Sequence, residues 1–260
     1  MRWATVCVRC RKVAPKKTAE TDAIFAHLEQ LRQQHQADKT VLRFSMDAKA
    51  TVLIGEYSRG GQNRLVVKAA DHDFRPTDKV TPYGIFLPDH DRLFLYFTCG
   101  PVTSDFIVDC LLDCWSHIAP DFPAVQTLVL LQDNGPENHS RRTQFMQRIS
   151  QLADHLQRTV QLLYYPPYHS KYNPVERVWG RLEQHWNGDL LDSVTAVLNF
   201  AKSMTWQQRQ PIVAFVHQLY HTGVRLSQKA MSLLEQRFER LNGLEKYFVL
   251  IRPLPNPLPG

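Results

Sequence analysis

A mostly apolar run at residues 125–131 lies between two segments with helical periodicity, and this arrangement limits the folds open to the chain. The flanking segments, residues 103–118 and 140–158, each place apolar side chains on one side, as amphipathic helices do. A strand that is apolar on both faces is typical of a central position with helices packed on either side. The pattern therefore predicts an α/β fold.

The remaining apolar runs extend the sheet on both sides of this strand. Strands are predicted at residues 41–54, 64–67, 93–98, 125–131 and 160–164, with a polar loop at 71–84. Three consecutive strands indicate an antiparallel meander, whereas strands that alternate with helices are added in parallel. We therefore expect a mixed five-stranded sheet with helices on both faces and a helical C-terminal extension.

Four parts are expected along the 260 residues. They are a basic N-terminal arm and helix at 1–40, a main α/β domain at 41–190, a helical extension at 191–250 and a Pro-rich tail at 251–260. The helices of the extension are predicted at 190–202, 208–221 and 226–241, because their apolar residues recur with a helical period.

Charge and cysteine content narrow the class of protein. The net charge is +6, from 31 basic and 25 acidic residues, which favours a polyanionic partner such as nucleic acid. The start of the chain lacks a secretory apolar region and no apolar run is as long as a membrane span. Five cysteines, an odd number, indicate free thiols in a reducing cytoplasm. Cys7 and Cys10 form a CxxC without a second pair at zinc-site spacing, so a zinc site is not expected.

Three acidic residues stand at informative positions. Asp47 lies inside an apolar strand, where Asp is uncommon, although on an edge strand it would simply face solvent. Asp133 directly follows the central strand, at the kind of edge where α/β sites form, although DNGP is also a turn sequence. Glu176 lies in the first turn of a helix, where Asn173 as N-cap and Glu176 would equally form a capping box.

The three acids together point to a metal site. One lies in the first strand, one after the fourth and one on the helix after the fifth, which is the order found in ribonuclease-H-like sheets. Two divalent ions about 3.5–4 Å apart need several anionic ligands. Oxygen ligands favour Mg²⁺ or Mn²⁺. We therefore predict that two such ions bind Asp47, Asp133 and Glu176.

Other residues are predicted to support or rival this set. Asn134 and Asn173 are expected to hydrogen-bond the ligands, and Glu137 is a rival ligand. Glu183 lies on the same helix face as Glu176 and is either a spare ligand or, as we expect, part of a solvated face. Trp179 and Trp186 are expected to pack their helix onto the sheet. The predicted contacts with DNA are His169, Lys171, Tyr172, Arg141, Arg142 and Arg177.

Four segments of the chain resemble one known family. SMDAKATVLIGEYSRGG, LFLYFTCGPVTSDFIVDCLLDCW, LLQDNGPENHSRRTQF and YYPPYHSKYNPVERVWGRLEQHWNG are similar to DDE transposases of bacterial insertion sequences, most closely the ISAzo type. PPYHSKYNPVERVW also resembles the third-acid motif of the mariner-like group. The resemblance covers roughly residues 10–250 and implies that Asp47, Asp133 and Glu176 are the catalytic triad. The family's helix-turn-helix region is expected to be missing, because too few residues precede Asp47.

The resemblance implies metal-dependent DNA strand cleavage and strand transfer at insertion-sequence ends. It also implies a homo-oligomer on DNA, no membrane association and a place at the bacterial nucleoid. The alternatives are another ribonuclease-H-like nuclease or resolvase, and an inactive truncated remnant that only binds DNA.

Overall fold

The computed structural model describes residues 16–56, 76 and 78–255. Cys7, Cys10 and the strand predicted at 64–67 lie outside these residues. None of the described helices is long and apolar enough to cross a membrane.

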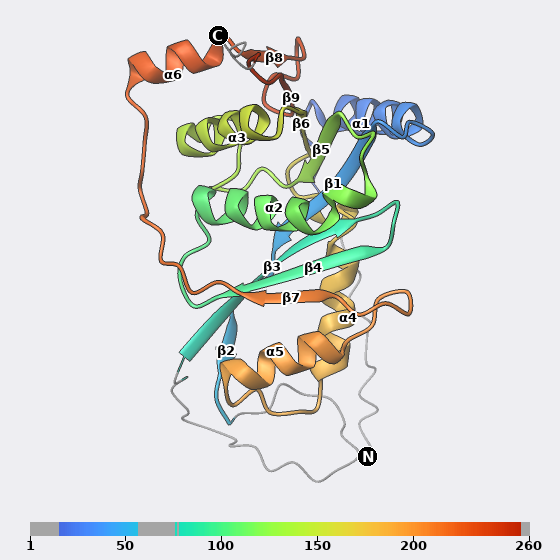
Figure 1. Ribbon diagram of the computed structural model, residues 1–260, viewed down its shortest axis with the longest axis vertical. Coiled ribbons are helices and arrows are strands. Elements are labelled where there is room, and N and C mark those ends of the chain that lie inside the picture. The colour runs from blue at the N-terminus through green and yellow to red at the C-terminus, as the bar shows by residue number, and fades with distance from the viewer. Residues whose placement is uncertain (1–15, 57–75, 77, 256–260) are drawn as a thin grey trace, which may run out of the picture.

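A single mixed sheet runs through the molecule (Figure 1). Its order is β7-β4-β3-β1-β5-β6-β9-β8, and the short β2 pairs with β3 beside this path. β1 is central, antiparallel to β3 and parallel to β5. The strands are β1 Val41–Ala48, β2 Val52–Ile54, β3 Asp78–Leu87, β4 Arg92–Thr98, β5 Thr127–Gln132, β6 Thr159–Tyr164, β7 Ile212–Phe215, β8 Phe238–Arg240 and β9 Phe248–Ile251.

Helices cover both faces of this sheet, and the core consists of two apolar clusters. α2 and α3 contribute to one apolar cluster, and α4 and α5 to another. The helices are α1 Thr21–His35, α2 Ser104–Ile118, α3 Thr143–Leu156, α4 Glu176–Trp186, α5 Val194–Ser203 and α6 Gln228–Glu235. The helices predicted at 103–118 and 140–158 are thereby confirmed as α2 and α3.

The alternation of side chains along the strands explains the two cores. In β4, Phe94 and Tyr96 belong to the cluster with α2, whereas Leu95 and Phe97 belong to the cluster with α4. Successive side chains of a strand point to opposite faces, so one strand serves both clusters. In β1, the apolar residues Phe44 and Met46 join the α2 side. Ser45 and Asp47 therefore face α4.

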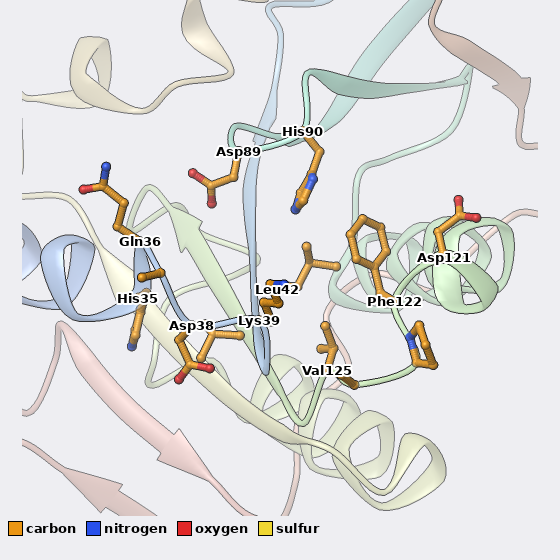
Figure 2. Close-up of a pocket in the computed structure, with 14 residues that line it drawn as sticks. His35, Gln36, Asp38, Lys39, Leu42, Asp89, His90, Asp121, Phe122 and Val125 are labelled. Carbon is orange, nitrogen blue, oxygen red and sulfur yellow. The ribbon is translucent and has the colours of Figure 1, made fainter.

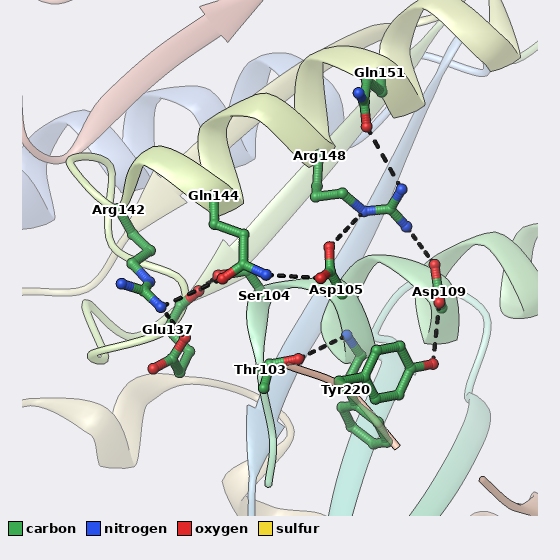
Figure 3. Close-up of polar contacts among 11 residues, drawn as sticks. Thr103, Ser104, Asp105, Asp109, Glu137, Arg142, Gln144, Arg148, Gln151 and Tyr220 are labelled. Carbon is green, nitrogen blue, oxygen red and sulfur yellow. Dashed lines mark hydrogen bonds and ion pairs between the residues drawn. The ribbon is translucent and has the colours of Figure 1, made fainter. Parts of the chain in front are cut away.

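Polar contacts join α2 to α3 over the sheet (Figure 3). Arg148 of α3 forms ion pairs with Asp105, at 3.0 Å, and with Asp109 of α2. The hydroxyl of Tyr220 donates to Asp109 over 3.0 Å, which ties a C-terminal segment to the same helix. Thr103 caps α2, because its side chain accepts from the backbone N–H of Phe106.

The N-terminal half of the sheet differs from the prediction at β3. Residues 78–87 form this ten-residue strand, although 71–84 was predicted as a polar loop. Pro82 and Gly84 are depleted in strand interiors and led to that error. β3 pairs with β1 at one end and with β2 at the other, so the strand predicted at 41–54 is broken into two.

The C-terminal part was predicted to be helical, but it adds three strands to the sheet. β7 replaces the helix predicted at 208–221, and α6 with β8 replaces the one at 226–241. β9 pairs with β6 on one side and with β8 on the other, so β8 forms the second edge of the sheet. Short apolar runs fit a helix or a strand equally well by periodicity, and here pairing with an open sheet edge decided. Cys110 and Cys114 are buried, whereas Cys99 is exposed.

Candidate active site

The three predicted acids lie at the end of the sheet where β1, β5 and β6 end. Asp47 is next to the last residue of β1, and Asp133 directly follows β5. β1 and β5 are parallel and pair Met46 with Gln132, so Asp47 and Asp133 occupy the next pair of positions. Glu176 begins α4, the helix that follows β6. Neighbouring parallel strands thus carry the two aspartates to one edge.

The charges of these acids affect one another. Burial, followed by the charges of Asp133 and Glu176, raises the pKa of Asp47 from 3.8 to about 7. Burial and the charge of Glu176 raise the pKa of Asp133 to about 6, although a hydrogen bond from Asn173 opposes this rise. Opposing or like charges shift a pKa at short range, so the three carboxylates lie close enough to attract a common cation.

One oxygen of these three acids has no partner in the described part of the chain. Oδ1 of Asp133 is buried and has no hydrogen-bond partner among the described residues. As they stand, no three His, Cys, Asp or Glu side chains of the described chain enclose a metal position. The donor chemistry nevertheless fits a hard divalent cation, because buried carboxylate oxygens that repel one another gain most from Mg²⁺ or Mn²⁺.

The start of α4 is fastened to β1, not capped as predicted. Asn173 is buried, and its side-chain Nδ2 donates to the backbone oxygen of Met46 over 3.0 Å. Ser45 Oγ donates to Asn173 Oδ1 and accepts from the backbone N–H of Val175, over 2.8 Å in the second case. The helix begins only at Glu176, so the predicted Asn173 cap is wrong, and the capping box that was the alternative role of Glu176 is not formed. The carboxylate of Glu176 is thereby left for the acidic cluster.

Trp179 contributes more than the packing predicted for it. Its Nε1–H donates to Oδ2 of Asp47 over 3.3 Å, and Trp186 packs farther along the same helix. The prediction that both indoles pack α4 onto the sheet is confirmed, but the bond to Asp47 was missed. A spacing of three residues from Glu176 was the available signal, since it puts both side chains on one face of the helix.

The other predicted ligands have partners elsewhere. Glu137 pairs with Arg142 over 3.0 Å, on the side of α3 (Figure 3). Glu183 pairs with Lys49 and accepts from the indole of Trp186 over 2.8 Å. Asn134 is exposed, whereas Asn173 bonds to Asp133, so of the two predicted amides only Asn173 reaches the cluster.

The predicted DNA contacts divide into exposed and buried residues. Lys171, Arg141 and Arg177 are exposed, and Tyr172 keeps 52% of its surface accessible. The Nζ of Lys171 lies 5.1 Å from the centre of the Tyr172 ring. Arg142 is engaged by Glu137.

His169 does not suit the predicted contact with DNA. Only 4% of its surface is exposed, and its ring centre lies 5.4 Å from that of Phe25 in α1. His169 therefore packs the loop before α4 against α1 instead of facing solvent.

A pocket of about 530 Å³ lies at the opposite end of β1 and β5 (Figure 2). It is lined by residues 35–39, 41–42, 89–90 and 121–125. Two of its carboxylates, Asp89 and Asp121, form ion pairs with Arg43 and Arg92. Because β1 spans about 3.3 Å per residue, the pocket is roughly 20 Å from Asp47 and belongs to a different part of the surface.

The chain is similar to transposases by two kinds of comparison. The family model described as the Rhodopirellula transposase DDE domain matches residues 7–253. The mariner Mos1 paired end complex with Mg superposes with a TM-score of 0.54 at 12% identity, over 76% of this chain and 58% of that one. The complex with Mn gives 0.52 at 11%, over 74% and 57%. These likenesses confirm the predicted ribonuclease-H-like fold.

The chain spans 57% to 58% of the length of these two solved structures. No curated protein matches it.

Proposed function

Since the chain belongs to the family of Rhodopirellula transposase DDE domains, we propose that it cleaves DNA strands at the ends of a mobile element and joins them to a target. The observation that carries the proposal is the placement of Asp47, Asp133 and Glu176 at one end of the sheet, where Asp133 and Glu176 lie close enough to raise the pKa of Asp47. These three residues would hold two Mg²⁺ or Mn²⁺ ions. Such ions, when bound, stabilise the charge that develops on the attacking and leaving oxygens of a phosphoryl transfer.

The residues of the chain supply the frame for this chemistry. Partial burial raises the pKa values of Asp47 and Asp133 and leaves these two acids partly protonated near neutral pH, so a cation that binds them displaces protons. Asn173 bonds both to Asp133 and to the backbone of β1, which orients the second acid relative to the first. Asp133 Oδ1 is buried and has no hydrogen-bond partner in the described chain, so a bound cation would satisfy this acceptor.

DNA is the proposed partner. One of the similar structures is described as the Mos1 transposase paired-end complex with left transposon end, with a TM-score of 0.50. Exposed Lys171 and Arg177 flank the start of α4 and would contact DNA phosphates there. Two paired ends call for more than one catalytic centre, so the proposal includes a homo-oligomer on DNA that works at the bacterial nucleoid.

The test uses labelled duplexes that carry the DNA flanking the coding sequence, incubated with the full chain and Mn²⁺. We expect strand nicking and a joined product, and a loss of at least about a hundredfold in Asp133→Asn, since even residues behind metal ligands contribute 10- to 100-fold. Asp192→Asn, at an exposed position before α5, should keep the wild-type rate.

Each other outcome favours a different reading. Hydrolysis without joining would favour another nuclease or resolvase of this fold. Binding without nicking would favour an inactive remnant. Equal nicking by the wild type and Asp133→Asn would show that the site is elsewhere.

A further inference from the structure

Trp179 and Glu176 present their side chains from the same face of α4. The indole Nε1–H of Trp179 donates to Oδ2 of Asp47 over 3.3 Å, and the indole is 6% exposed. Residues three apart on a helix are neighbours on its surface. One turn of α4 therefore carries one acid of the cluster and a hydrogen-bond donor to another.

Gly84 makes room for this indole. It lies directly opposite Asp47 in the pairing of β3 with β1. A Cβ atom at this position would be 2.7 Å from Cη2 of Trp179 and 2.9 Å from Cγ2 of Val175. Any side chain on Gly84 would therefore push the indole away from β3. The residue opposite the first acid must be glycine for the indole to reach that acid.

The helix start holds the indole at a fixed height above the sheet. The Val175 N–H bonds to Ser45 Oγ over 2.8 Å, and Asn173 Nδ2 bonds to the Met46 oxygen over 3.0 Å. These partners lie on β1 immediately before Asp47. α4 is thus anchored on the residues that precede the acid, and the indole reaches the acid itself.

We propose that Trp179 is a positioning residue that orients the Asp47 carboxylate through its Nε1–H bond, and that Gly84 leaves the space that the indole occupies. The inference rests on the proposed function and deepens it, because a ligand held in one orientation binds a cation more tightly. A carboxylate has about four acceptor sites, so the bond to Oδ2 holds Asp47 without excluding it as a ligand.

Metal affinity tests the inference without relying on turnover. The full chain is titrated with Mn²⁺ in the absence of DNA, and free Mn²⁺ is followed by electron paramagnetic resonance. Trp179→Phe keeps an aromatic ring but removes the donor. We expect it to weaken Mn²⁺ binding by about tenfold, the usual effect of losing a residue that supports a ligand.

Trp186→Phe is the matched control. Trp186 is also buried on α4, and its Nε1–H also donates to a carboxylate, Glu183, over 2.8 Å. We expect Mn²⁺ binding within about twofold of wild type for this variant, with a fall in melting temperature similar to that of Trp179→Phe. Equal Mn²⁺ affinities in the two variants would overturn the inference.

Gly84→Ala provides a second variant that leaves both the indole and the acid in the sequence. By displacing the ring it should weaken Mn²⁺ binding as Trp179→Phe does. Wild-type Mn²⁺ affinity in Gly84→Ala would overturn the claim that the indole needs the space left by Gly84.

The contact is tested separately from metal binding by the ¹⁵N–¹H resonance of the Trp179 indole. Asp47→Ala should shift this resonance and leave that of Trp186 unchanged. An unmoved Trp179 resonance would overturn the inference. A wild-type chain that binds no Mn²⁺ would instead overturn the proposed metal-dependent function, and the indole shift would still decide whether Trp179 holds Asp47.

Discussion

Asn173 donates its side-chain amide to the backbone oxygen of Met46 over 3.0 Å, although 126 residues separate the two in sequence. The same side chain accepts from Ser45 and bonds to Asp133. One buried amide therefore joins the start of α4 to β1 and to the residue that follows β5.

Replacing this amide should destabilise the fold. Asn173→Ala leaves the Met46 oxygen and the Ser45 hydroxyl buried without these partners, so we expect the free energy of unfolding to fall by about 2–3 kcal/mol. Urea denaturation measures the change. Asn134→Ala, at an exposed position beside Asp133, should cost less than about 0.5 kcal/mol. Equal effects would mean that the bonds of Asn173 contribute nothing.

Stability should fall as pH rises toward neutrality in the presence of EDTA. The folded-state pKa values of Asp47, about 7, and Asp133, about 6, lie above the ordinary 3.8. Between these values the folded chain binds more protons than the unfolded chain, so the free energy of unfolding decreases with pH in this window. We expect it to be larger at pH 5 than at pH 8 by on the order of 3 kcal/mol.

The pH effect has an internal control. The double variant Asp47→Asn, Asp133→Asn removes both titrating groups and should flatten the profile in the same urea measurements. A double variant with the wild-type slope would assign the effect to other residues.

Glu137 and Glu176 should respond differently to the same substitution. Glu137 pairs with Arg142 over 3.0 Å, whereas the charge of Glu176 acts on Asp47 and raises its pKa. We expect Glu176→Gln to lower Mn²⁺-dependent nicking by at least about a hundredfold and Glu137→Gln by less than about threefold. Gel assays of nicked DNA compare the two. A larger loss of nicking in Glu137→Gln than in Glu176→Gln would assign the third acid of the site to Glu137.

Lys171 and Arg177 should contribute to DNA affinity through phosphate contacts. Each neutralised phosphate adds about 0.9 to the salt dependence of binding, so Lys171→Ala and Arg177→Ala should each lower that slope by about 1. Fluorescence anisotropy at several salt concentrations measures it. His169→Ala should leave the slope unchanged and lower the melting temperature, because His169 is buried against Phe25. A reduced slope in His169→Ala would contradict this assignment.

The central part of the fold could be predicted because its signals are local. α2, α3 and β5 follow from the amphipathic period and from an apolar run, and β6 from a second one. β3 was missed because Pro82 and Gly84 look like loop residues, and β7 was missed because four apolar residues do not distinguish a strand from a helix. In both cases the deciding contribution was pairing with a strand distant in sequence.

The sequence by itself determined which acids are available and which strand or helix carries each, since these depend on residue type and short-range pattern. The tertiary structure decided how they are held. Asn173 was read as a helix cap, yet its amide bonds to β1, and Trp179 was read as packing, yet its indole reaches Asp47. Both contacts join residues more than 120 positions apart and arise where the start of α4 packs on β1, whose place in the sheet is fixed by its register with β3 and β5. No local pattern encodes that register, because it follows from which faces of the whole sheet are buried.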